Sequence, residues 1–355
     1  MARAKGFQGI VGWAPGTTWG TAVAAAALRG IEVKDLSVVG NRALIPDAQM
    51  TGRATARASR KGDLKVEGSL MTDLRYEGLE PLIANVLGTA GAPTTSDTSG
   101  KKHVFVLKDD LDGVFGTLAY ELLKDTTVVE IPSAKIVGLT IKCAAGQSPE
   151  VEFRFVGNDY KTDSAVNTTT TIDTVTYPAN REFAAFAQSV LRMNAASGGA
   201  LAGSDAIFIS SWEISIDRGL EGAVTTQFGD KIGEPRPTGP TKITGTIEFA
   251  DLQDGTGGNL AFIADQLAAT PKKLDLTITS PTLCGSATQY YQHVLYLPCV
   301  QFGDGKPAIN SWGALTWSAP FEAFHAPAVP TGFPATYDEA ITWEVYSQRA
   351  TDALA

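Results

Sequence analysis

The sequence predicts a mainly β protein built from two tandem antiparallel β-sandwich or barrel modules, each with one flanking α-helix. Three observations predict this class. The 355 residues include 36 glycines and 18 prolines and show little helical periodicity, which is typical of short strands joined by turns. Several segments alternate strictly between apolar and polar residues. A pattern in the first half returns 177 residues later, and a repeat at half the chain length indicates two copies of one module.

The first 35 residues are expected to form an N-terminal arm. Trp13, Pro15 and Trp19 precede a short apolar run at 22–28, so this segment lacks the charged-then-apolar order of a signal peptide. Large aromatic residues are hard to bury within an arm and commonly anchor protein interfaces. Trp13 and Trp19 are therefore predicted to insert into a partner.

The first module is expected over residues 36–157 and the second over 183–355. Lys-Val-Glu-Gly-Ser-Leu at 65–70 matches Lys-Ile-Thr-Gly-Thr-Ile at 242–247. Upstream, 36–38 are aligned with 213–215 inside strand-like runs. Downstream, helix-compatible segments follow at 76–87 and 259–268. Each carries an apolar stripe, formed by Leu79, Leu82, Ile83 and Val86 in the first and by Leu260, Ile263, Ala264 and Leu267 in the second.

Each copy then returns to a strand pattern. Apolar residues alternate with polar ones over 151–155, over 212–217 and over 315–318, as in strands that bury one face. Residues 183–193 are expected to form the first strand of the second module. The polar, Thr-rich segment at 158–182 is expected to be a linker or a long hairpin.

Two long loops precede the shared motif at equivalent positions, 51–63 and 229–241. The first is basic, and the second carries Arg236 and three prolines. Loops of about a dozen residues at equivalent positions are usually functional or disordered.

The charge, the cysteine content and the hydropathy of the sequence limit the classes of function that it can have. The net charge of −9 argues against a nucleic-acid-binding surface. Residues 1–60 carry eight Lys and Arg against three Asp and Glu, an asymmetry that fits either pairing between neighbouring subunits or chance clustering. Three cysteines without metal-type spacing indicate free thiols in a reducing compartment. No run of about 18 apolar residues exists, so no membrane insertion is expected.

The sequence contains no pattern for catalysis or for a cofactor. A phosphate loop, a nucleophile elbow, a zinc-protease motif and a dinucleotide fingerprint are all missing. The Gly-Asp-Gly-Lys-Pro run at 303–307 has the wrong spacing for a phosphate loop and predicts a turn. His103, His293 and His325 have no partner at metal-ligand spacing, and the acidic run at 109–113 departs from a calcium loop. We therefore expect no enzyme activity, no metal and no organic cofactor.

Six tryptophans leave a carbohydrate-binding β-sandwich protein of a tail or cell surface as the alternative function. Trp212, Trp317 and Trp343 lie in alternating strands and are predicted to be core residues, while Trp312 fits either core or edge. A carbohydrate-binding module needs no half-chain duplication with equivalent long loops. The repeat therefore favours a structural role.

The motifs, taken in order, resemble the tail tube proteins of long-tailed bacteriophages. The opening Gly-Trp and Thr-Trp-Gly-Thr, a Gly-centred strand, a Glu-Gly helix entry and a Gly-Leu-Thr-Ile strand are similar to that family. So are a strand closing on Gly-Asn-Asp, a second-half strand and the final strand. The corresponding residues are 12–13, 18–21, 66–70, 76–79, 138–141, 151–159, 212–217 and 340–347. Each motif is loose, but their order covers nearly the whole chain.

The resemblance implies a structural virion protein of the phage tail, assembled in the host cytoplasm. In this family, sheets join edge to edge around a ring, which closes a barrel and removes exposed edges. Stacked rings form a tube that conducts DNA during ejection. Rings generally contain six modules, so a two-module chain implies a pseudo-hexameric trimer. The alternative is a hexamer in which one module decorates the outside.

The resemblance also implies roles for charged and aromatic residues. An acidic lumen would keep DNA mobile, because cationic contacts hold phosphates. The lumen candidates are Glu150, Glu152, Glu213, Asp217 and Glu248. The candidates for contact with an adjacent subunit or ring are Trp13, Trp19, Arg53, Arg57, Arg60, Lys61 and Arg236. The expected partners are further copies of the chain, tape measure and terminator proteins, and transiently passing DNA.

Overall fold

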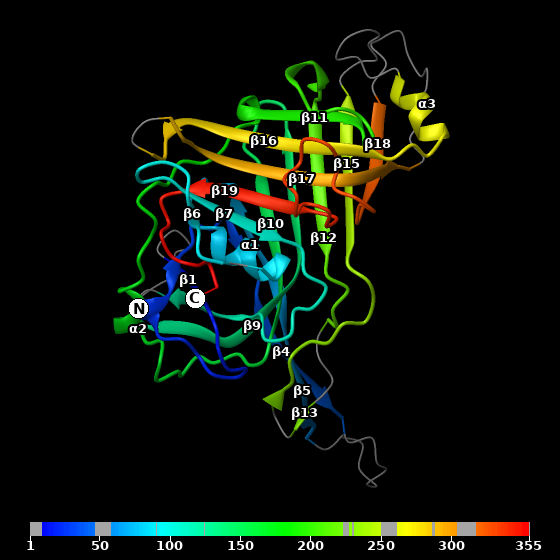
Figure 1. Ribbon diagram of the computed structural model, residues 1–355. Coiled ribbons are helices and arrows are strands. Elements are labelled where there is room, and N and C mark those ends of the chain that lie inside the picture. The colour runs from blue at the N-terminus through cyan, green and yellow to red at the C-terminus, as the bar shows by residue number, and fades with distance from the viewer. Residues whose placement is uncertain are drawn as a thin grey trace.

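The computed structural model describes residues 9–46, 58–89, 91–123, 125–222, 227–228, 231–249, 261–285, 288–303 and 317–354. The chain is mainly β, as predicted. Two layers of strands cross each other: β10, β12, β15 and β18 run down one layer, and β16, β17 and β19 lie across them in the other (Figure 1). All ladders between the described strands are antiparallel, and hydrogen bonds join 17 of these strands into one network.

The first layer, here called the long sheet, joins strands of both halves of the chain. Its order is β4-β5-β10-β9-β12-β15-β18, and β3 (Asp35–Leu36) also pairs with β5. The strands are β4 (Val39–Ile45), β5 (Arg60–Asp73), β10 (Glu150–Gly157), β9 (Thr127–Ala144), β12 (Ser211–Asp217), β15 (Lys242–Phe249) and β18 (Trp317–Phe324). The two halves meet at the β9–β12 ladder, where Trp212 lies opposite Cys143.

The second layer covers the apolar face of the long sheet. The N-terminal half of β9 continues into this layer and pairs with β8, and β17 likewise belongs to both layers. The remaining strands are β1 (Val11–Pro15), β2 (Arg29–Gly30), β6 (Thr94–Thr95), β7 (Lys101–Val106), β8 (Gly116–Leu123), β11 (Ser189–Ala195), β16 (Lys272–Leu283), β17 (Tyr290–Phe302) and β19 (Thr342–Ser347). A separate hairpin pairs β13 (Gln227–Phe228) with β14 (Lys231–Ile232). One apolar core runs between the layers through both halves of the chain.

The two halves share one order of strand pairing. The first runs β1-β8-β9-β10-β5-β4 and the second β11-β16-β17-β18-β15-β12. Both β8–β9 and β16–β17 contain a register shift near the start of the earlier strand, after Gly116 and Lys272. The ladders also correct the sequence alignment by one residue. Leu36 faces Leu70, and Trp212 faces the equivalent Ile247, so position 36 corresponds to 212 and not to 213.

The two predicted helices differ in how they are packed. α1 (Glu80–Leu87) is buried along its whole length on β9, β1 and β7, and Gly88 ends it at φ 82°. Its predicted apolar stripe is confirmed. In α3 (Ala261–Leu267), Ile263 packs on the core, but Ala264 is exposed and Leu267 is 73% exposed. Leu260 lies outside the described residues. The prediction that Ala264 and Leu267 belong to a buried stripe is wrong, because none of the described strands packs on α3 to a comparable extent.

Two other segments are more structured than the sequence suggested. The Thr-rich segment contains α2 (Thr169–Ile172), which Thr168 caps, and Ile172 is buried against η2 (Ala25–Ala27) and its neighbours. This part of the expected linker or hairpin therefore packs on the folded body. The strand expected over 183–193 begins only at Ser189, because a short helix, η3 (Phe186–Gln188), precedes it. A second short helix of this kind, η4, spans Gly203–Asp205.

The described part of the expected N-terminal arm is integrated into the sandwich. β1 pairs with β8 over five residues, and Trp13 is fully buried, with its ring 5.5 Å from that of Phe155. Gly116 makes room for this ring, since a Cβ there would lie 2.4 Å from the indole. The expectation that Trp13 anchors a partner is therefore wrong. The strand partner that makes its burial possible lies a hundred residues away in the sequence.

We expect Trp13→Ala to lower the free energy of unfolding by about 3–5 kcal/mol, as large-to-small core substitutions do. Phe183→Ala is the control, because Phe183 is 53% exposed and its removal should change stability by less than about 0.5 kcal/mol. Urea unfolding monitored by fluorescence gives both values. Equal effects of the two substitutions would contradict the assigned burial.

Candidate functional site

The candidate site is the outer face of the long sheet. Strict alternation points one set of side chains into the core and the other set outward. In β12, Trp212, Ile214 and Ile216 are buried while Glu213 and Asp217 are exposed. β10 and β15 alternate in the same way. The ladders therefore align the outward residues of six neighbouring strands, β5 to β18, into one polar surface, here called the polar face.

All five predicted acidic candidates lie on this polar face. Glu150 and Glu152 come from β10, Glu213 and Asp217 from β12, and Glu248 from β15. Glu213, Asp217 and Glu248 are exposed, and the other two are half-buried. The structure thus brings together carboxylates that are up to 98 residues apart in the sequence.

Acidic groups outnumber basic groups on the polar face. The alternation of the strands and their register show which charged side chains point to this face. The carboxylates are those of Glu67, Asp73, Glu150, Glu152, Glu213, Asp217, Glu248 and Glu322. The cations are those of Lys65, Lys142, Arg154 and Lys242. Sequence reasoning missed Glu67, Asp73 and Glu322. The alternation of β5 and β18 could have identified them, had the order of the strands been known.

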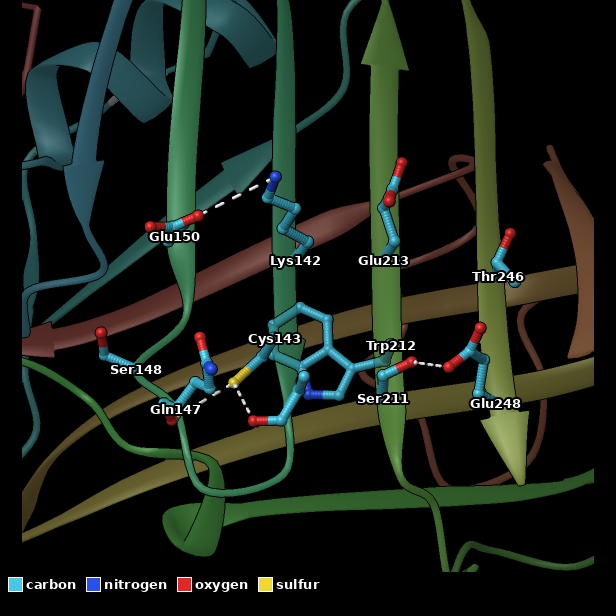
Figure 2. Close-up of a pocket in the computed structure, with 11 residues that line it drawn as sticks. Lys142, Cys143, Gln147, Ser148, Glu150, Ser211, Trp212, Glu213, Thr246 and Glu248 are labelled. Carbon is cyan, nitrogen blue, oxygen red and sulfur yellow. Dashed lines mark hydrogen bonds and ion pairs between the residues drawn. The ribbon is translucent and has the colours of Figure 1, made fainter. Parts of the chain in front are cut away.

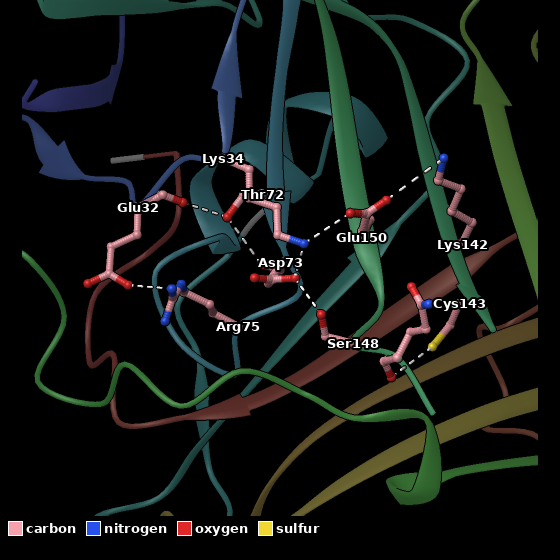
Figure 3. Close-up of polar contacts among 10 residues, drawn as sticks. Glu32, Lys34, Thr72, Asp73, Arg75, Lys142, Cys143, Ser148 and Glu150 are labelled. Atoms are coloured by element: carbon pink, nitrogen blue, oxygen red, sulfur yellow. Dashed lines mark hydrogen bonds and ion pairs between the residues drawn. The ribbon is translucent and has the colours of Figure 1, made fainter. Parts of the chain in front are cut away.

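A polar network lies at one side of this face (Figure 3). Lys34 Nζ lies 2.7 Å from Asp73 Oδ1 and 2.9 Å from Glu150 Oε1, and Lys142 lies 3.8 Å from the other Glu150 oxygen. The hydrogen bond that Lys34 donates to Asp73 raises the pKa of Lys34. Ser148 donates a hydrogen bond to Asp73 at 2.6 Å. Since these side chains are partly exposed, each ion pair contributes only about 0–1 kcal/mol, and the network mainly fixes side-chain positions.

The polar face is hollowed where the two halves meet (Figure 2). The hollow has a volume of about 410 Å³, and Lys142, Glu150, Glu213, Thr246 and Glu248 line it. Ser211 donates a hydrogen bond of 2.6 Å to Glu248. Four of these six side chains carry charge in an open depression, an arrangement suited to water and mobile ions and not to an apolar ligand.

The β9–β12 joint crosses the middle of the polar face. Thr140 and Ser215 share a hydrogen bond of 3.0 Å across the joint. Arg154 reaches over β9 to Asp217, at 3.6 Å, and it can do so because Gly138 has no side chain; a Cβ there would lie 2.1 Å from the guanidinium. The joint is therefore held by backbone hydrogen bonds, with charged groups lying over it.

On the inner side of the joint, Arg218 is almost completely buried just after β12. Its backbone N–H donates to Val137 O at 3.0 Å, and its Nη2 donates to the carbonyl of Lys108. Burial lowers the pKa of Arg218 to about 10, and the charge of Asp109 partly offsets this effect. The guanidinium thus ties the second half of the chain to a loop of the first half.

The predicted contact residues are scattered. Trp19 is half-buried, donates from Nε1 to Ile232 O at 2.9 Å, and packs edge-on against Phe115. Arg60 and Lys61 belong to β5 and not to a loop, because they pair with Ile45 and Leu44. Arg236 is exposed near the β13–β14 hairpin. Arg53 and Arg57 lie outside the described residues.

The histidines and cysteines that the structure describes have structural surroundings. No group of three or more His, Cys, Asp or Glu side chains in the described ranges could hold a metal ion. Cys143 and Cys284 are buried free thiols, and Cys299 is half-buried. Trp212, Trp317 and Trp343 are core residues, as predicted, and Trp312 lies outside the described ranges. No fully exposed tryptophan is present in the described part of the chain to bind a sugar.

Among these residues, His293 has a strongly lowered pKa. Its Nδ1 accepts a hydrogen bond from Trp343 Nε1 at 3.1 Å, so the proton is on Nε2, which lies 3.0 Å from the carbonyl oxygen of Arg75. Burial lowers its pKa from 6.5 to about 4. The neutral imidazole is therefore the form that the folded core holds.

Stability should consequently fall as the pH drops from about 6.5 to about 4, because the unfolded chain binds a proton that folded His293 does not. This histidine alone accounts for about 3 kcal/mol of loss. His293→Gln should flatten that part of the profile, whereas His325→Gln should not. NMR titration of the wild-type imidazole provides a direct check, and protonation of His293 above pH 6 would contradict the assignment.

A comparison with protein families identifies a relationship for this chain. The family model described as phage tail tube protein matches residues 6–343 of the chain. No curated protein matches it. In the described residues, no helix combines the length and the apolar character needed to cross a membrane.

Proposed function

Because this chain belongs to the phage tail tube protein family, we propose that it polymerises into stacked rings that form a tail tube and conduct DNA during ejection. One observation carries this proposal: the two halves of the chain join into a continuous antiparallel sheet with a polar, net acidic face. A sheet that already extends across two modules needs only further copies to close into a ring.

We propose three copies in each ring. Strands β4-β5-β10-β9 of the first half and β12-β15-β18-β17 of the second follow the same order along the long sheet, which supports two modules that occupy equivalent places. Three such chains would make a ring of six modules. The single core shared by both halves supports modules that move as one unit in that ring.

The polar face is the proposed lumen wall. Duplex DNA releases counterions when cations contact its phosphates, so a cationic wall would bind and slow it. Here Lys142 and Arg154 lie beside Glu150 and Asp217, while Glu213 remains exposed in the central hollow. A wall on which carboxylates outnumber cations, and on which two of the four cations lie beside a carboxylate, repels phosphates at short range.

The adjoining ends of β4 and β5 and the segment with β13 lie at the same end of the molecule (Figure 1). We propose that these two regions, including Arg60, Lys61 and Arg236, contact the next ring, as do Arg53 and Arg57. Contacts between exposed charged groups of stacked rings are individually weak, but a tube repeats each of them in every ring. Tape measure and terminator proteins are the proposed further partners.

Negative-stain electron microscopy of the purified protein tests the assembly. We expect rings or tubes whose averaged cross-section shows six similar densities, with a mass of three chains per ring. A ring of six chains, or a second half outside the wall, would refute the trimer. Monodisperse monomers at all concentrations would contradict the function itself.

Charge reversal tests the lumen. Glu152, Glu213 and Glu248 replaced together by Lys should leave assembly intact, because these side chains face away from the core, but should lower DNA ejection from assembled particles by roughly tenfold or more. The matched triple replacement by Gln should have a much smaller effect. Ejected DNA is measured by nuclease protection. Normal ejection from the Lys variant would show that this face does not line the DNA path.

A further inference from the structure

A second hollow, here called the junction pocket, lies at the end of the long sheet where β12 ends and β15 begins. Its volume is about 490 Å³, and none of the described residues lines both this pocket and the hollow of the polar face. The first half of the chain contributes the loop after β7 and Lys135 of β9. The second half contributes the turn after β12, the segment before β15, the end of β18 and the residues that lead into β19. Both halves of the chain therefore enclose the junction pocket.

The walls of the junction pocket are mainly apolar. Leu107 and Leu111 are buried, Leu220 is half-buried, and Phe324 is 39% exposed at the end of β18. Two prolines of the segment before β15 add apolar surface and have no backbone N–H to offer. Apolar walls with a few polar groups are typical of pockets that bind organic ligands.

The buried guanidinium of Arg218 also lines the junction pocket, and it is only partly hydrogen-bonded. Arg218 is 2% exposed, and its Nη2 donates to the carbonyl of Lys108. Its Nε and Nη1 are buried and have no acceptor among the described residues. The charge of Asp109 favours the charged form of Arg218, but the described side chains form no ion pair between the two. Buried donors of a charged group destabilise the structure unless an acceptor meets them, so these two N–H groups favour an anionic ligand.

The other cations of the junction pocket already have partners or lie in water. Lys135 Nζ donates to Leu111 O at 2.6 Å and lies 2.5 Å from Glu234 Oε1. Lys242 is exposed. A bound anion would therefore gain most from Arg218, where its charge would meet donors that nothing else in the described structure uses.

The charge around the pocket selects the kind of anion. Four carboxylates line it in addition to the cations, and they are those of Asp109, Asp112, Glu322 and Glu339. Three of the four are exposed, and Glu339 is half-buried. A single negative charge is offset by the guanidinium of Arg218, whereas every further charge of a phosphate or a nucleic acid would be repelled by these carboxylates. The pocket thus fits a monoanion.

We propose that the junction pocket binds a monocarboxylate with an apolar body, whose carboxylate accepts hydrogen bonds from the free N–H groups of Arg218 while its apolar part packs on Leu220 and Phe324. Because neighbouring atoms cover these N–H groups, binding includes a rotation of the guanidinium toward the pocket. A free carboxylic acid and a peptide with an acidic residue beside an apolar one present the same chemistry. The inference goes beyond the proposed tube and does not depend on it, because it uses only groups of one chain.

Isothermal titration calorimetry of the purified full chain at neutral pH tests the proposal with matched probes. 4-Phenylbutyrate is compared with the neutral 4-phenylbutyramide, and N-acetyl-Leu-Asp amide with N-acetyl-Leu-Asn amide. We expect the carboxylate to bind at least about tenfold more tightly than its amide, since hydrogen bonds to charged groups are stronger than those between neutral groups. Inorganic phosphate should bind at least about tenfold more weakly than the carboxylate, because the four acidic side chains repel it.

Two further measurements locate the bound carboxylate. Arg218→Met removes the donors and keeps an unbranched side chain, so it should lower the affinity for the carboxylate to that for the amide. Arg181→Met is the matched control, because Arg181 is 57% exposed and does not line the pocket, and it should bind like the wild type. In NMR spectra of the wild-type chain with labelled arginine, the Nε–H signal of Arg218 should shift when the carboxylate is added and not when the amide is added. Should circular dichroism show that Arg218→Met misfolds, the NMR measurement decides.

Each outcome supports or overturns the proposal. Binding of 4-phenylbutyrate supports it with a small molecule as the source of the carboxylate, and binding of the acidic peptide alone supports it with a protein segment as the source. Equal affinities for acid and amide, phosphate binding as tight as carboxylate binding, or an unchanged Arg218 signal would overturn it. So would a Kd above about 10 mM for both carboxylates, which corresponds to no useful affinity.

Discussion

The antiparallel ladder between β9 and β12 is the interaction on which the rest of the structure depends. It joins one strand of each half and makes the long sheet continuous across both, while the ladder between β7 and β19 joins the halves in the second layer. Because the backbone bonds of the β9–β12 ladder fix the register, they also fix which side chains share a face. The common core, the hollow and the polar face all follow from this pairing.

Close backbone approach at a few positions makes this arrangement possible. Gly138 lets Arg154 cross a strand, and Gly116 lets the indole of Trp13 lie against β8. In both cases a side chain from one strand occupies the space above another, so the smallest residue stands where the chains are closest. The charged groups above the joint contribute little stability but set the sign of the surface potential.

In a single copy, an open sheet ends in a strand that is paired on one side. Among the described strands, β4 is such an edge strand, because it pairs with β5 alone. Val39 is 44% exposed at this edge, whereas Ser215, at the equivalent place in β12, lies within the sheet between β9 and β15. Unpaired backbone donors and acceptors at such an edge favour the addition of a further strand. In the proposed assembly, backbone hydrogen bonds like those that join the two halves inside the chain would join neighbouring chains, with water as the competitor for each hydrogen bond.

The sequence by itself determined the strands, the first helix and the inward or outward direction of residues such as Glu213 and Trp212, because alternation and helical periodicity are local. It also offered five carboxylates on alternating strands as candidates, and its repeat anticipated the common strand order, but the ladders decided that these carboxylates share a face. Only the tertiary structure decided that Trp13 is buried, that the Thr-rich segment folds onto the core, and that position 36 corresponds to 212. These features depend on pairing between residues distant in the chain, and a local pattern carries no information about which strand lies beside it.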